Sequence, residues 1–330
     1  LCSGPLLLSL FPFLVVSRLL IQCPESDLLA LPFRLAAWGI GIRRPCAARV
    51  LCIGFLGGFA PAASAAAQAV RTGQLTAEEA DALLPACICS GPSFVVLTVG
   101  QSMLGSAELG VLLFAAQITA NYLTAALLNR FAGVHSVEQE SAAPASPAPP
   151  RLDEILADAA ITYCKLCGFI LFFRLLAAGA GALLPTGAGT LCAILLEVCS
   201  GCDLASRTGR WGSLLCCAAL SVQGLSVLLQ VRTICPAEMT LHPLYRARIL
   251  HLPLSLALFY LLLPGGEADV FSTLPARVLL MRRVPPDCAL LVFAVCCMAA
   301  CTLRSGIRQV EQKQMARNAG GCCINSKTLL

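Results

Sequence analysis

The chain carries small and polar residues inside stretches that are otherwise apolar, and these positions are the ones best suited to hold a small molecule. The clearest is Ser90-Gly91-Pro92, which lies within the apolar residues 84–100. Proline has no N–H and glycine loosens the backbone, so a helix must break there. A bilayer tolerates the freed backbone groups only beside a cavity or packed protein. A broken helix at membrane depth predicts a transport site.

Four such breaks are predicted, and they form two matched pairs with one member of each pair in each half of the chain. The candidate substrate-binding residues at the breaks are Gly57, Gly58, Ser90, Gly91, Pro92, Ser200, Gly201, Gly224, Ser226 and Gln230. Helix N-termini exposed at breaks offer free N–H groups and a positive dipole end, which suit carboxylates. Alternatively, the glycines only let helices pack closely. The matched pairs favour a shared binding site for a small anionic substrate.

Glu197 is an acidic residue inside an apolar stretch, one turn before a predicted break. A charge at the bilayer centre costs about 2.5–3.5 kcal/mol on insertion scales, so such residues usually have a function or a partner. Glu197 is therefore the candidate carrier of a coupling proton or cation. The alternative is an ion pair with Lys165 or Arg174.

The cysteines suggest packing more than metal binding or redox chemistry. Cys164-x-x-Cys167 and Cys199-x-x-Cys202 have the spacing of zinc or redox pairs. Both pairs fall in apolar stretches, and nothing in the sequence places them together. We expect small buried thiols in a reducing setting, with neither a metal nor another cofactor.

The composition predicts an all-α polytopic membrane protein. Hydrophobic residues make up 58% of the 330 residues, charged residues only 12%, and the mean hydropathy is +0.80. The apolar stretches, each expected to enter the lipid bilayer, are 5–23, 50–70, 108–128, 163–184, 187–199, 214–234, 249–263 and 288–303. The net charge of +5 is spread over short loops, so nucleic acid is not an expected partner. Because the chain opens on Leu1, we expect an upstream segment.

A polar, proline-rich linker at 134–150 divides the chain. The predicted units are a membrane repeat at 1–133, a second at 151–264, a loop and C-terminal transmembrane helix at 265–304, and a polar tail at 305–330. In the first repeat, Thr76 and Glu79 predict a capping box that starts a soluble helix, which Pro85 would end. In the second, His242 and His251 sit among Pro243, Arg246 and Arg248, which favours an interfacial basic segment over a relay.

Several motifs in order along residues 8–263 resemble one family. They are Leu10-Phe-Pro-Phe13, Gly57-Gly-Phe59, Gly73-Gln-Leu-Thr-Ala-Glu-Glu79, Ser90-Gly-Pro92, Leu196-Glu197 with Ser200-Gly201, and Gly224-Leu-Ser-Val-Leu-Leu-Gln230. Together they resemble the sporulation integral membrane proteins of the YlbJ type. The resemblance implies two nucleoside-recognition, or Gate, repeats in inverted orientation with broken or re-entrant helices. It also implies a bacterial cell membrane, namely the outer forespore membrane, and export of dipicolinic acid from the mother cell.

Three classes of function remain open. A small-anion transporter is the preferred hypothesis, with a nucleoside-type carrier as its variant. A non-transporting scaffold for spore-envelope assembly is the second. An enzyme is the weakest, because no nucleophile–base pair, phosphate loop or strong zinc motif is present. A homo-oligomer is possible in each case.

Overall fold

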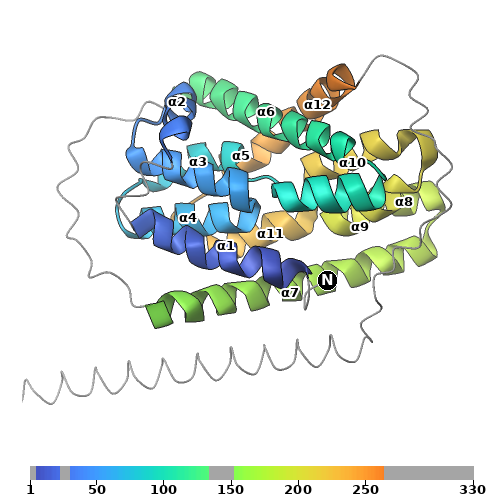
Figure 1. The fold of residues 1–330 in the computed structure, drawn as a ribbon, viewed down its shortest axis with the longest axis horizontal. Helices are drawn as coiled ribbons and strands as arrows, with labels where there is room; N and C mark the ends of the chain where they lie inside the picture. Colours follow the sequence, from blue (N-terminus) through green and yellow to red (C-terminus); the bar gives the residue numbers. More distant parts are fainter. Residues whose placement is uncertain (1–4, 23–29, 134–151, 264–330) are drawn as a thin grey trace, which may run out of the picture.

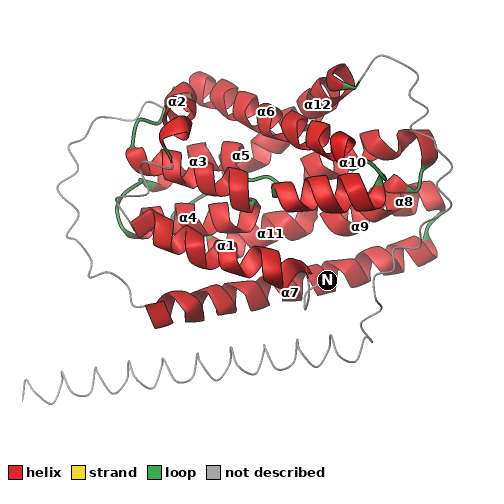
Figure 2. Cartoon of the chain, viewed as in Figure 1, coloured by secondary structure: helices red, strands yellow, loops and turns green. Residues whose placement is uncertain are grey.

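The computed structural model describes residues 5–22, 30–133 and 152–263, and every regular element in these ranges is a helix (Figure 2). In chain order they are α1 (Pro5–Gln22), α2 (Leu31–Ile40), α3 (Pro45–Gly57), α4 (Phe59–Arg71), α5 (Ala77–Cys87), the π-helix η2 (Ser93–Met103), α6 (Ala107–Ala132), α7 (Leu152–Leu183), α8 (Thr186–Leu196), α9 (Val198–Ser206), the 3₁₀ turn η3 (Gly209–Trp211), α10 (Gly212–Val222), α11 (Gly224–Ile234) and α12 (His242–Leu262). The all-α prediction is therefore confirmed for these ranges. The predicted linker at 134–150, the C-terminal helix at 288–303 and the tail lie outside them.

Three segments are long and apolar enough to cross a membrane. Within the described residues they are Ala107–Ala132, Asp153–Leu183 and Gly209–Ile234. The apolar stretch predicted at 163–184 belongs to a longer continuous helix, α7, which starts at Leu152. Gly209–Ile234 is not a single rod, because Gln223 interrupts it.

The two described parts of the chain follow the same order of elements. Each has a long first helix (α1, α7), a broken pair (α3/α4, α8/α9), a second broken pair (α5/η2, α10/α11) and a long last helix (α6, α12). The helix α2 has no counterpart in the second part. In Figure 1, α1 and α7 lie side by side along the lower edge and run in opposite directions. An ion pair of 2.6 Å joins Arg18 of α1 to Asp158 of α7.

The helix α5 shows both a correct and a wrong prediction. The capping box is present: Thr76 Oγ1 accepts from the Glu79 N–H at 3.1 Å, and Glu79 accepts from the Thr76 N–H at 2.9 Å. Pro85 does not end the helix, which continues to Cys87. Nor is α5 on a surface, because its residues from Glu79 to Pro85 are buried. α3, α4, α6 and α12 pack around it, and its two buried carboxylates have partners: Glu79 pairs with Arg44, and Asp81 accepts from the Thr240 N–H.

Alanine lets α4 lie at the centre of the bundle. Its buried residues are almost all small, and α1, α3, α5 and α11 pack against it. Small residues let helix backbones approach closely inside a membrane, where no hydrophobic force drives helices together. The helices α5 and α11, which border two other breaks, thereby pack against the helix that starts at the Gly58 break.

The chain breaks its helices at Gly58, Ile88–Pro92, Glu197 and Gln223. Three of these positions match the predicted breaks, and the third break along the chain is shifted. It lies at Glu197 itself, so Ser200 and Gly201 belong to the first turn of α9. The reason is local: the Glu197 carboxylate caps α9, and the new helix starts directly after it.

Candidate binding site at the helix breaks

The two breaks of the first part are in backbone contact. Gly58 has φ +83°, and a Cβ there would lie 2.7 Å from the Gly91 nitrogen. Only glycine combines this conformation with so close an approach. At Gly91 itself a Cβ would meet the Gly57 oxygen at 3.4 Å, which is ordinary contact.

The two breaks of the second part meet in the same way. Gly224 has φ +72°, and a Cβ there would lie 2.9 Å from the Glu197 nitrogen and the Leu196 oxygen. Gly224 therefore serves the packing of one break on the other.

A cavity of about 90 Å³ lies where the two pairs of breaks come together. It is lined by Leu56 to Ala60, by Ser90, Gly91, Ser93 and Phe94, by Glu197 to Cys199, and by Ile170, Val227 and Gln230. Both parts of the chain thus contribute backbone from their breaks to one hollow.

The predicted site residues divide into two groups. Those that line the cavity are Gly57, Gly58, Ser90, Gly91, Gln230 and Glu197. Those that do not are Pro92, Ser200, Gly201, Gly224 and Ser226. Ser200 is turned toward Glu197, and Ser226 accepts a hydrogen bond from Gln230 Nε2 at 2.8 Å. A Cβ at Gly201 would lie 2.8 Å from the Ile194 Cα, so this glycine packs α9 on α8.

Glu197 occupies the N-terminal end of α9 and is only 2% exposed. One carboxylate oxygen accepts from the Cys199 N–H at 2.7 Å, and the other accepts from the Ser200 N–H at 2.7 Å and the Ser200 hydroxyl at 2.8 Å. The alternative ion pair with Lys165 or Arg174 is not formed in the part of the chain that the structure describes. The positive dipole end of α9 is therefore already capped by the Glu197 carboxylate.

The starts of α4 and η2 differ from that of α9. Both line the cavity, and neither has a side-chain cap, although the Phe94 and Val95 N–H groups of η2 donate to the Gly91 carbonyl at 3.1 Å. The first turn of a helix leaves its N–H groups without partners in the helix and forms a positive dipole end. The cavity therefore has two uncapped positive ends on one side and the Glu197 carboxylate on another. The Gln230 Oε1 atom, buried and without a hydrogen-bond partner, adds an acceptor.

A second polar cluster lies behind the Ser90 break, and the sequence reasoning missed it. The Ile88 carbonyl accepts from Arg248 Nη2 at 2.7 Å, from Gln223 Nε2 at 3.1 Å and from Asn121 Nδ2 at 3.4 Å. The helices α6 and α12 and the break at Gln223 are thereby tied to the end of α5. Carbonyls at a helix C-terminus lack helical partners and attract cations, which explains a guanidinium at this point.

The prediction of an interfacial basic segment is wrong for Arg248 and His251, whereas His242 and Arg246 of the same segment are exposed. Arg248 is 8% exposed and His251 is 1% exposed, both inside the bundle. Ser255 continues the same helix face, and its hydroxyl lies 2.5 Å from that of Ser221. The spacing i, i+3, i+7 was a signal that these polar residues share one face of α12.

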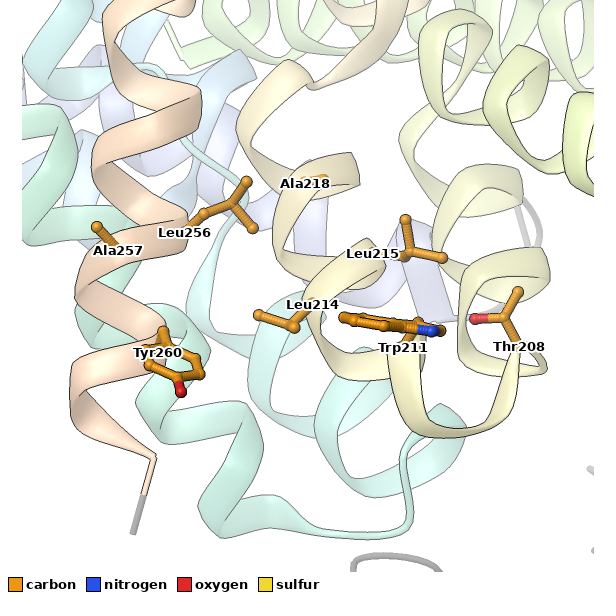
Figure 3. Close-up of a pocket in the computed structure, with 8 residues that line it drawn as sticks. All are labelled: Thr208, Trp211, Leu214, Leu215, Ala218, Leu256, Ala257 and Tyr260. Atoms are coloured by element: carbon orange, nitrogen blue, oxygen red, sulfur yellow. The ribbon is translucent and has the colours of Figure 1, made fainter. Parts of the chain in front are cut away.

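A larger pocket of about 560 Å³ lies between η3, α10 and α12 (Figure 3). Leu214 and Leu215 line it from one side and Leu256 and Tyr260 from the other, and no charged residue is among its lining. Binding sites for polar ligands need a few placed polar groups to orient the ligand. The smaller cavity has the Glu197 carboxylate and the Gln230 amide, whereas the polar groups of the larger pocket are the hydroxyls of Thr208 and Tyr260 and the Trp211 indole N–H.

Over the described residues, the fold and the cavity define a class: an all-helical chain with three segments of membrane-crossing length and with shorter helices whose breaks meet at one cavity. No family model matches the chain, and no match is found among curated proteins or solved structures. Within the described ranges, no group of three or more His, Cys, Asp or Glu side chains is placed to hold a metal ion.

Proposed function

We propose that this protein is a membrane transporter that binds a small organic anion in the cavity between the helix breaks. The observation that carries the proposal is that both parts of the chain contribute broken backbone to one hollow, the arrangement in which repeat-built transporters hold their substrates. The opposite directions of α1 and α7 support inverted repeats.

The charges around the cavity support an anion that enters together with a proton or cation. The uncapped starts of α4 and η2 favour a carboxylate, with Ser90 as an added donor. Glu197 opposes it: two like charges about 6 Å apart repel by about 3 kcal/mol at an effective dielectric constant of about 20. A co-bound proton or cation at Glu197 removes this repulsion, so the carboxylate is the proposed coupling group.

The cavity volume indicates a closed state of the carrier. At about 90 Å³ it is smaller than the roughly 300–1,000 Å³ of typical ligand sites. Substrate entry therefore requires the two pairs of breaks to separate. The contacts that must open are those between the two breaks of the first part and the two breaks of the second part. The backbone contacts of Gly58 with Gly91 and of Gly224 with Glu197 stay in place.

Dipicolinate is the first substrate to test, because the resemblance to the YlbJ-type sporulation proteins implies it. The same resemblance supports a bacterial cell membrane, specifically the outer forespore membrane. A planar dianion also suits a site with two positive helix ends.

The test is uptake into vesicles that contain the full-length protein. Dipicolinate, a nucleoside and a simple dicarboxylate are compared, with and without a proton or sodium gradient. We expect gradient-dependent uptake of dipicolinate. Preference for the nucleoside would support a nucleoside-type carrier, and no uptake of any of the three would support a scaffold.

A matched pair of variants connects the uptake to the cavity. Gly91→Val adds a side chain to the cavity lining, whereas Gly168→Val adds it where no atom lies within 4 Å. We expect Gly91→Val to abolish uptake and Gly168→Val to retain it at equal protein levels. Equal uptake by the two variants would contradict a site at the breaks.

A further inference from the structure

We propose that Arg248 sets the charge preference of the carrier by supplying the positive charge that balances an anionic substrate at the Ser90 break. This inference rests on the proposed transport function and deepens it. Arg248 does not line the cavity, so it acts on the substrate from behind the break as a specificity-determining residue.

Arg248 is a buried cation without a carboxylate partner in the described residues. Nη2 donates to the Ile88 carbonyl at 2.7 Å and Nη1 to Asn121 Oδ1 at 3.4 Å, while Nε has no partner. Ion pairs among the described residues include Arg18 with Asp158, Arg44 with Glu79, and Arg207 with Asp203. Buried charges are normally paired, because an isolated one is costly to remove from water. An anion that binds nearby would supply the missing charge.

The position of the guanidinium brings its charge within reach of the cavity. Its hydrogen-bond acceptor, Ile88, lies two residues before Ser90, and Ser90 lines the cavity. Two residues span at most about 7 Å of chain, so the charge lies on the order of 10 Å from a ligand at Ser90. Gln223 donates to the same Ile88 carbonyl, so a break of the first part and a break of the second part both lie next to the Arg248 guanidinium.

A purely structural role gives a different prediction from a charge role. If Arg248 only donates a hydrogen bond to the Ile88 carbonyl at the end of α5, its loss weakens the binding of every ligand by the same factor. If its charge acts on the ligand, the loss grows with ligand charge. At about 10 Å and an effective dielectric constant of about 20, Coulomb's law gives about 15-fold in affinity for each negative charge.

Two variants change this charge by different routes. Arg248→Gln removes the cation. Asn121→Asp keeps it and places a carboxylate next to Nη1, where Asn121 Oδ1 already lies at 3.4 Å. Arg248→Lys is the matched control, because it keeps the charge and changes the shape. If Arg248→Gln does not fold, Asn121→Asp still carries the test, since the new ion pair with Nη1 offsets the lost 3.4 Å hydrogen bond from Asn121 Nδ2 to the Ile88 carbonyl.

The experiment measures binding of dipicolinate (dianion), picolinate (monoanion) and picolinamide (neutral) to the purified full-length protein by calorimetry. For Arg248→Gln and Asn121→Asp we expect the dipicolinate-to-picolinate affinity ratio to fall about 15-fold, while Arg248→Lys keeps it. An unchanged ratio with equal losses for all ligands would overturn the role of Arg248 and leave the transport proposal standing. Failure of the unaltered protein to bind any of the three would overturn the transport proposal and this inference with it.

Discussion

Replacing Gly58 with alanine is expected to separate the two breaks of the first part. The Gly58 backbone has φ +83° and ψ −166°, a conformation that is essentially restricted to glycine and costs about 1–3 kcal/mol for other residues. The new Cβ would also lie 2.7 Å from the Gly91 nitrogen and 3.1 Å from its Cα. Both are backbone atoms, so no side chain can rotate away, and overpacking adds typically about 1–3 kcal/mol.

The expected loss in the free energy of unfolding for Gly58→Ala is therefore about 2–6 kcal/mol. Gly91→Ala is the matched control at the other side of the same contact, because its Cβ meets only ordinary contacts at 3.4 Å and beyond. Its expected loss is below about 1 kcal/mol. A third variant, Gly168→Ala on α7, has open space around the new methyl and is expected to be neutral or stabilising by up to about 1 kcal/mol.

Reversible denaturation in detergent micelles, followed by circular dichroism, gives the three free energies under one condition. The order of stability should be Gly168→Ala, then Gly91→Ala, then Gly58→Ala. If Gly58→Ala proved as stable as Gly91→Ala, the backbone contact between the two breaks would be refuted, and the shared cavity would lose its basis.

Three further changes test other parts of the structure. Glu197→Gln should tighten anion binding at least tenfold and remove the dependence of uptake on a proton or cation gradient, since about 3 kcal/mol of repulsion is lost; calorimetry and vesicle flux measure the two effects. Thr76→Ala should lower the free energy of unfolding by about 1 kcal/mol through loss of the α5 cap, whereas Thr72→Ala, whose hydroxyl only donates to helix carbonyls, should change it less. Asp81→Asn should cost about 1–3 kcal/mol, because the carboxylate accepts from the Thr240 N–H and hydroxyl at 2.7 Å each; normal stability would refute this tie between α5 and the start of α12.

The positions of the breaks were largely predictable because their causes are local. Gly58 needs a positive φ, and Pro92 cannot continue the hydrogen bonds of α5, so neighbouring residues alone interrupt the helices. The shift of the third break to Glu197 has a cause that is local as well. A glutamate that caps the helix after it was present in the sequence, but it was interpreted only as a charge.

The surroundings of the breaks were harder to predict. The sequence of α5, with Glu78, Glu79 and Asp81 in its first half, was compatible with a surface helix, and only the packing of four other helices makes it a buried one. The burial of Arg248 depends on a contact with the Ile88 carbonyl, 160 residues away in the chain. No sequence pattern near Arg248 or near Ile88 predicts that these two residues are in contact.

The amino-acid sequence by itself determined that this chain is helical and apolar, and that its helices break at four places, because helix propensity, missing N–H groups and capping act over a few residues. The tertiary structure alone decided which breaks touch, which of the predicted residues face the cavity, and that a guanidinium from α12 reaches the end of α5. These are results of long-range packing, in which small residues on α4 let distant segments approach, and such approach depends on the whole bundle at once.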